Sequence, residues 1–90
     1  MRAFVSRENG FQITFSNKIT VSVVFGKYTF SDGGETTCEV AVIDNHEWLI
    51  RNDDGEWIRI REYAEVMSRI TADELAVIIN EVSNMLCTEK

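Results

Sequence analysis

Proline is absent from the chain, which also contains only one histidine and two cysteines in 90 residues. Because no CxxC pair occurs and His46 stands alone, a single copy cannot assemble a zinc site from Cys and His ligands. We expect Cys38 and Cys87 to be reduced thiols that act as small buried side chains, with a disulfide between them as the alternative. No repeat, linker or low-complexity tract divides the sequence, so residues 1–90 should form one domain.

Long hydrophobic runs are missing as well. A membrane-spanning helix needs about 18 consecutive apolar residues, and no such run is present. The N-terminal residues also lack the apolar segment and cleavage pattern of a signal peptide. These absences favour a cytoplasmic protein that does not enter a membrane.

Signatures of catalysis and of cofactor binding are equally scarce. His46 lies in a predicted turn between acidic residues, and no nucleophile motif accompanies it. The glycines at 33–34 are not followed by the Lys-Ser/Thr pair and the helix that a phosphate-binding loop requires. Aligning Gly55 with the invariant glycine of a calcium loop puts Ile50 at the first ligand position, which excludes an EF-hand. The sequence therefore predicts no enzymatic activity, no cofactor and no metal site.

Negative charge is present in excess. The net charge is −6, from 15 acidic and nine basic residues. Residues 32–56 alone carry −7, whereas residues 1–31 carry +3 and residues 57–90 carry −2. An acidic surface repels a phosphate backbone and attracts a basic protein, so direct nucleic-acid binding is disfavoured. The alternative is that these carboxylates serve only solubility.

Alternating apolar and polar residues predict β-strands. Residues 11–16 and 19–25 alternate most regularly, and further strands are expected at 2–5, 38–43, 48–51 and 57–60. For both apolar sets of the first hairpin to face one core, Phe15 must lie opposite Ile19. Asn17 or Lys18 should then adopt a left-handed conformation within a three-residue loop.

A second hairpin is expected on either side of residues 52–56. With Gly55 in a left-handed conformation, Ile50 lies opposite Ile58, and Trp48 lies opposite Ile60. We expect Trp48 to fill the core beneath a helix, with a binding hot spot as the alternative. The other face of this hairpin is half polar and is expected to be exposed; it carries Arg51, Trp57 and Arg59.

The last segment has the pattern of an amphipathic helix. Thr71 and Glu74 have the spacing of a capping box, and Glu81 falls on the polar side. The apolar stripe consists of Leu75, Ile78, Ile79, Val82, Met85 and Leu86. Residues 63–67 fit either a helix or a last strand. The sequence thus predicts an α+β fold, in which an antiparallel meander of about five strands is covered on one face by a C-terminal helix at about residues 71–87.

Three stretches resemble small uncharacterised proteins encoded by bacteriophages. They are the hairpin of residues 11–26, the Glu-Val-Ala-Val strand of residues 39–42 and the helix start of residues 71–76. The resemblance covers most of residues 11–80, and its motifs are structural, so it carries over no catalytic residue. It implies a phage accessory protein, a class that includes anti-CRISPR inhibitors, some of which imitate the charge of nucleic acids.

The predicted function is non-enzymatic binding that inhibits a host protein by occlusion in the host cytoplasm. The partner would present a basic surface, such as that of a nucleic-acid-binding defence complex, and Trp57 would anchor the contact. The residues predicted to bind it are Asp44, Glu47, Asp53, Asp54, Glu56, Trp57 and Arg59. The alternative is a small homodimeric structural or assembly protein with no inhibitory role.

Overall fold

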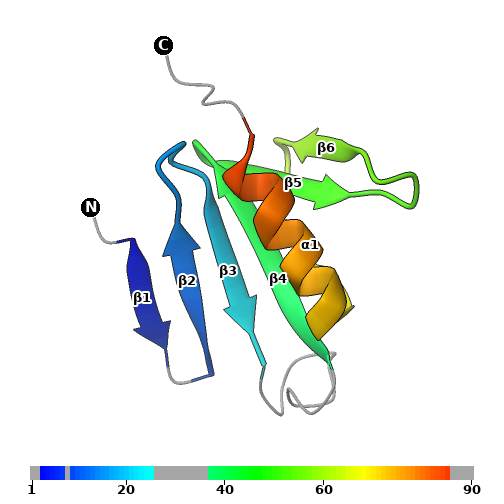
Figure 1. The fold of residues 1–90 in the computed structure, drawn as a ribbon. Coiled ribbons are helices and arrows are strands. Elements are labelled where there is room, and N and C mark those ends of the chain that lie inside the picture. Colours follow the sequence, from blue (N-terminus) through cyan, green and yellow to red (C-terminus); the bar gives the residue numbers. More distant parts are fainter. Residues whose placement is uncertain (1–2, 8, 26–36, 86–90) are drawn as a thin grey trace.

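The computed structural model describes residues 3–7, 9–25 and 37–85, and it has an α+β fold with one antiparallel sheet and one helix (Figure 1). The helix is α1 (Ala72–Ser83), and the strands are β1 (Phe4–Arg7), β2 (Gly10–Thr14), β3 (Thr20–Val24), β4 (Thr37–Asp44), β5 (Glu47–Arg51), β6 (Trp57–Ile60) and β7 (Met67–Thr71). The predicted fold class is therefore confirmed, with seven strands in place of about five. The segment that fitted either helix or strand ends in β7, and its residues 63–66 belong to neither.

β1 to β6 follow one another along the sheet, as a meander requires, but β7 breaks this order by pairing with β4. One edge of β4 is shared between two strands. β5 pairs with Val42, Ile43 and Asp44 at one end, and β7 pairs with Thr37, Cys38 and Val40 at the other. The sheet therefore forks beyond β4. Figure 1 shows β5 and β6 running at a steep angle to β2, β3 and β4.

Both hairpin registers agree with the prediction. Ile13 lies opposite Val21, and the Phe15 N–H donates to the Ile19 carbonyl at 3.1 Å. Lys18 is the left-handed residue of that loop, with a φ of 71°. In the second hairpin Gly55 has a φ of 83°, and the predicted pairs Ile50–Ile58 and Trp48–Ile60 are present.

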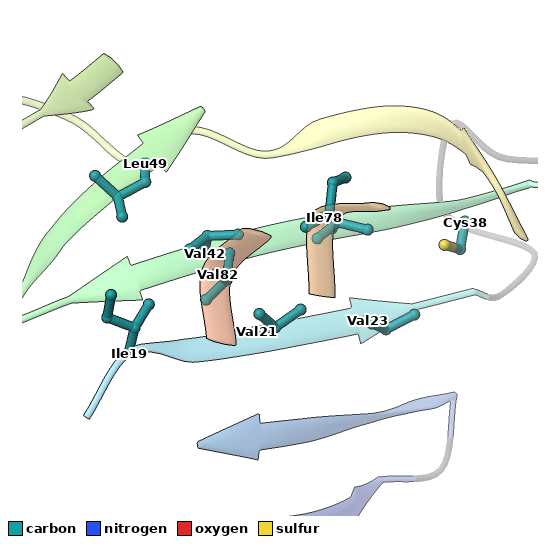
Figure 2. Close-up of a cluster of buried hydrophobic side chains, with 9 residues drawn as sticks. Ile19, Val21, Val23, Cys38, Val42, Leu49, Ile78 and Val82 are labelled. Carbon is teal, nitrogen blue, oxygen red and sulfur yellow. The ribbon is translucent and has the colours of Figure 1, made fainter. Parts of the chain in front are cut away.

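The core lies between one face of the sheet and α1 (Figure 2). Val21, Val40 and Val42 from the central strands are fully buried, as is Val82 from the helix. The predicted helical stripe is confirmed, because Ile78 is also buried and the other described members pack against the same cluster: Leu75, Ile79 and Met85. Leu86 lies outside the described residues.

Cys38 belongs to this core as a free thiol. It is 7% exposed, and burial raises the pKa of its thiol, which keeps the group neutral and unreactive. The expectation of a buried cysteine is therefore confirmed for Cys38. Cys87, its partner in the alternative disulfide, lies outside the described residues.

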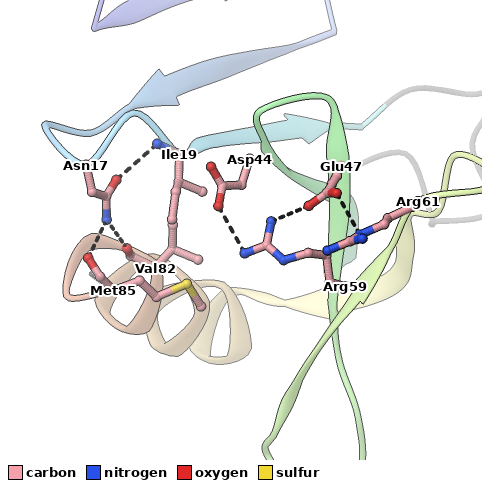
Figure 3. Close-up of polar contacts among 8 residues, drawn as sticks. All are labelled: Asn17, Ile19, Asp44, Glu47, Arg59, Arg61, Val82 and Met85. Atoms are coloured by element: carbon pink, nitrogen blue, oxygen red, sulfur yellow. Dashed lines mark hydrogen bonds and ion pairs between the residues drawn. The ribbon is translucent and has the colours of Figure 1, made fainter. Parts of the chain in front are cut away.

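Both ends of α1 have specific caps. The Thr71 Oγ1 accepts from the Glu74 N–H at 3.2 Å, and the Glu74 Oε1 accepts from the Thr71 N–H at 2.9 Å, as the capping box predicts. The helix is shorter than predicted, because its C-terminal end is at Ser83 and not near residue 87. There the Asn17 Nδ2 donates to the carbonyls of Val82, at 2.8 Å, and Met85, at 3.0 Å (Figure 3). Asn17, from the β2–β3 loop, thus satisfies carbonyls that a helix end leaves open.

Candidate interaction surface

The seven residues predicted to bind a partner all lie on or beside the β5–β6 hairpin, where the structure separates them by position. Three lie in the loop between β5 and β6, which we call the hairpin tip: Asp53, Asp54 and Glu56. Three others, together with Arg61, form what we call the paired end: Asp44, Glu47 and Arg59. Trp57 lies between the two groups, at the start of β6.

At the paired end, two arginines from the end of the hairpin hold two carboxylates. Arg59 contacts the Asp44 Oδ2 at 3.1 Å and the Glu47 Oε1 at 2.7 Å, and Arg61 contacts the Glu47 Oε2 at 2.7 Å (Figure 3). The hydrogen bond that Arg59 donates to Glu47 is the main reason why the pKa of Arg59 is raised. Asp44 is only 3% exposed, so its carboxylate has little contact with water and needs hydrogen-bond donors within the protein.

The hairpin tip has a well-defined backbone and unpaired charges. The Asn52 Oδ1 accepts from the N–H groups of Asp54, at 3.0 Å, and Glu56, at 2.9 Å, which shapes the loop. Asp53, Asp54 and Glu56 are all exposed, and none forms an ion pair with any residue that the structure describes. Three carboxylates therefore face solvent on one short, ordered loop.

Glu81 of α1 attaches the middle of the hairpin to the helix. Its Oε1 accepts from the Arg51 Nε at 2.8 Å and from the Trp57 Nε1 at 3.0 Å, and its Oε2 accepts from the Arg51 Nη2 at 3.2 Å. The hydrogen bonds from Arg51, and then that from Trp57, lower the pKa of Glu81. Glu81, which was expected on the polar side of the helix, is thus half-buried against the hairpin.

These contacts reverse the predicted orientation of the hairpin. The face with Arg51, Trp57 and Arg59 was expected to be exposed, but it is turned toward α1 and half-buried. Leu49, which is 4% exposed, enters the core from this face. Trp48 was expected beneath the helix and lies instead on the opposite face, half-buried in a row with Ile43 and Ile60.

A cleft of about 520 Å³ opens where the sheet forks. Residues 51–53 of the hairpin form one side, Met67 and Ile70 of β7 form the second, and Val77 and Ile78 of α1 form the third. Glu74 also lines it. The hydrogen bond that Arg51 donates to Glu81 raises the pKa of Arg51, and the negative charge of Glu74 on the opposite side helps to raise it. Nothing in the sequence predicted this cleft, because residues 68–71 of β7 were not expected to form a strand and the cleft needs both strands that share the edge of β4.

In the described parts of the chain, no three His, Cys, Asp or Glu side chains are grouped so that they could hold a metal ion. The one described helix is too short to cross a membrane.

The structure therefore presents two features that a partner could recognise, the acidic hairpin tip and the adjoining cleft. Comparison of the chain with protein-family models, with curated proteins and with solved structures finds no match.

Proposed function

We propose that the chain is a non-enzymatic protein that binds a basic surface of another protein through the hairpin tip and blocks that surface by occlusion. Asp53, Asp54 and Glu56 make the contact in this proposal. Four other predicted residues hold the hairpin in the orientation that presents its tip, and so belong to the same surface: Asp44, Glu47, Trp57 and Arg59.

The observation that carries this proposal is the contrast in pairing along one hairpin. The acids of the paired end lie within 3.1 Å of arginine nitrogens, whereas the tip acids have no such partner among the described residues. Unpaired like charges on one loop repel one another, and a basic partner would relieve that repulsion. Their field would also accelerate association with such a partner.

Inhibition is the part of the proposal that the resemblance to phage proteins supports. A phage accessory protein of this charge would act in the host cytoplasm, and a nucleic-acid-binding defence complex offers the basic surface that the tip requires. Bound there, the carboxylates would take the place of phosphates. We propose this anti-CRISPR-like activity as the specific form of the function.

The test neutralises the tip without changing its shape. Asp53→Asn, Asp54→Asn and Glu56→Gln together remove three charges and keep every side-chain volume and the Asn52 hydrogen bonds. We expect wild-type protein to retain a basic host complex on an affinity column at low salt, and the triple variant to lose most of that complex. The matched control removes three acids elsewhere, with Glu62→Gln, Glu65→Gln and Asp73→Asn, and should bind like wild type. Equal retention by wild type and the tip variant would refute the proposal.

A second candidate function, a homodimeric structural protein, has one observation in its favour. Ile43, Trp48 and Ile60 form an apolar row on the sheet face that α1 does not cover, and Ile58, beside them, is 42% exposed. Sedimentation equilibrium separates the two functions. A dimer that Ile58→Lys dissociates and the tip variant leaves intact would favour the structural role.

A further inference from the structure

We propose that the cleft at the fork of the sheet binds a lysine or arginine side chain of the partner protein. This inference rests on the proposed function and extends it, because Asp53 belongs both to the hairpin tip and to the wall of the cleft. A chain lying across the tip can therefore place one basic side chain in the cleft.

The floor of the cleft suits the aliphatic part of such a side chain. Ile78 is buried, Met67 and Ile70 are half-buried, and Val77 is 44% exposed at the opening. Long basic side chains place their methylene groups on apolar surfaces and keep the charged end at the water boundary. The volume of about 520 Å³ is sufficient for one such side chain and the backbone beside it.

The charges around the opening select a cation. The Glu74 Oε1 accepts both the Thr71 N–H and the Thr71 hydroxyl, and no described residue donates to Oε2. Asp53 has no ion-pair partner among the described residues. Among the described residues that line the cleft, Arg51 is the one cation, and both carboxylate oxygens of Glu81 hold it. Its charge is thus balanced within the protein, and the two carboxylates set the sign of the field at the opening.

An irregularity in β7 lies beside this cleft. Cys38 pairs with Ile70 and Val40 pairs with Met67, so Ser68 and Arg69 together lie opposite a single residue of β4. Arg69 has a φ of 58°, which lies in the left-handed region that one class of β-bulge, the G1 type, also uses. Bulges change the direction of neighbouring side chains and occur frequently beside binding sites. This bulge is part of the cleft, because Ser68, one of its two residues, lines the cleft.

A pair of small ligands tests the inference without the partner. We expect N-acetyl-lysine methylamide to shift the NMR methyl signals of Met67, Val77 and Ile78, and the neutral analogue N-acetyl-norleucine methylamide to bind at least threefold more weakly. Glu74→Gln retains the capping box, because glutamine also serves at this position, and should weaken binding of the lysine derivative several-fold. Equal binding of both ligands, or tighter binding of N-acetyl-aspartate methylamide, would overturn the inference.

A second pair of variants separates the cleft from the hairpin tip. Val77→Trp fills the opening, whereas Ala76→Trp adds the same side chain at an exposed helix position that does not line the cleft. We expect only Val77→Trp to abolish the methyl shifts of Met67 and Ile78 and to weaken the partner complex about tenfold. Unchanged binding by Val77→Trp would overturn the inference, while loss of the complex in the tip variant would still support the proposed function. Asp54→Asn with Glu56→Gln changes only tip residues that do not line the cleft. If this double variant bound the partner normally and kept the methyl shifts, the cleft would be supported and the role of the tip refuted.

Discussion

The two ends of the β5–β6 hairpin carry carboxylates in different surroundings. At the paired end, Asp44 and Glu47 lie against two arginines, and Asp44 is almost completely buried. At the tip, three carboxylates face solvent, and Arg51, the nearest cation of β5, is engaged by Glu81. Removing the partner of a paired, buried charge destabilises the fold, whereas an unpaired, solvated charge adds little to folding and remains available to a partner. The same residue types therefore serve the fold at one end and, in our proposal, recognition at the other.

The largest expected effect is at the paired end. Arg59→Met keeps the length of the side chain but removes the cation beside the buried Asp44. We expect the free energy of unfolding to fall by about 2 kcal/mol, measured by urea denaturation. Arg61→Met is the matched control, because the Arg61 side chain is 73% exposed and its pair with Glu47 should contribute less than about 0.5 kcal/mol. Equal losses in the two variants would contradict the distinction between buried and solvated pairs.

In the two turns that flank β5, we expect exchanges between glycine and a larger residue to change stability in opposite directions. Gly55 has a φ of 83°, and a Cβ there would lie 3.2 Å from the Arg51 Nη2, so Gly55→Ala should cost about 1 kcal/mol. At the other turn, Asn45 and His46 have φ values of 53° and 70°, and glycine is favoured at the second position of such a turn. We expect His46→Gly to stabilise the protein by about 0.5 kcal/mol. Thermal unfolding of both variants measures the effects, and a destabilised His46→Gly protein would contradict the turn assignment.

How far the sequence predicts this site depends on the range of the interactions involved. The registers of both hairpins follow from the two-residue period, because a slip by one residue would move every apolar side chain to the wrong face. The capping box of α1 is equally local. The orientation of the β5–β6 hairpin is not determined locally, because both of its faces carry apolar and polar side chains. Glu81, 30 positions beyond Arg51, holds one of these faces to the helix.

The fork of the sheet was unpredictable for a related reason. β7 consists of Met67–Thr71, which is short, contains a bulge and leads directly into the capped helix. Its pairing with β4 joins segments about 30 residues apart and leaves no alternation in the sequence to reveal it. The cleft, which needs β5, β7 and α1 together, is therefore a property of tertiary structure alone.

The contact between the hairpin and the helix should depend on pH. The pKa of Glu81 is lower in the folded protein than in the unfolded chain, so its stabilising contribution is complete above the ordinary glutamate pKa. The contribution is lost as the pH falls through that value toward the pKa of the folded state. We expect the Tm of wild-type protein to exceed that of Glu81→Gln at neutral pH, and this difference to shrink as the pH is lowered toward 3. A difference that stays constant over this range would show that the charge of Glu81 contributes nothing to the contact.

The smallest effect on folding is expected at the tip, and it is the one that distinguishes the two ends most directly. Asp53→Asn, Asp54→Asn and Glu56→Gln together should change the free energy of unfolding by less than about 0.5 kcal/mol, because these carboxylates are solvated and make no ion pair among the described residues. Removing their mutual repulsion would, if anything, stabilise the loop. Urea denaturation of the triple variant measures this directly, and association with the partner should nevertheless slow, with a difference from wild type that disappears at high salt. A triple variant that loses as much stability as Arg59→Met would show that the tip acids belong to the fold, and the division between the two ends of the hairpin would then be wrong.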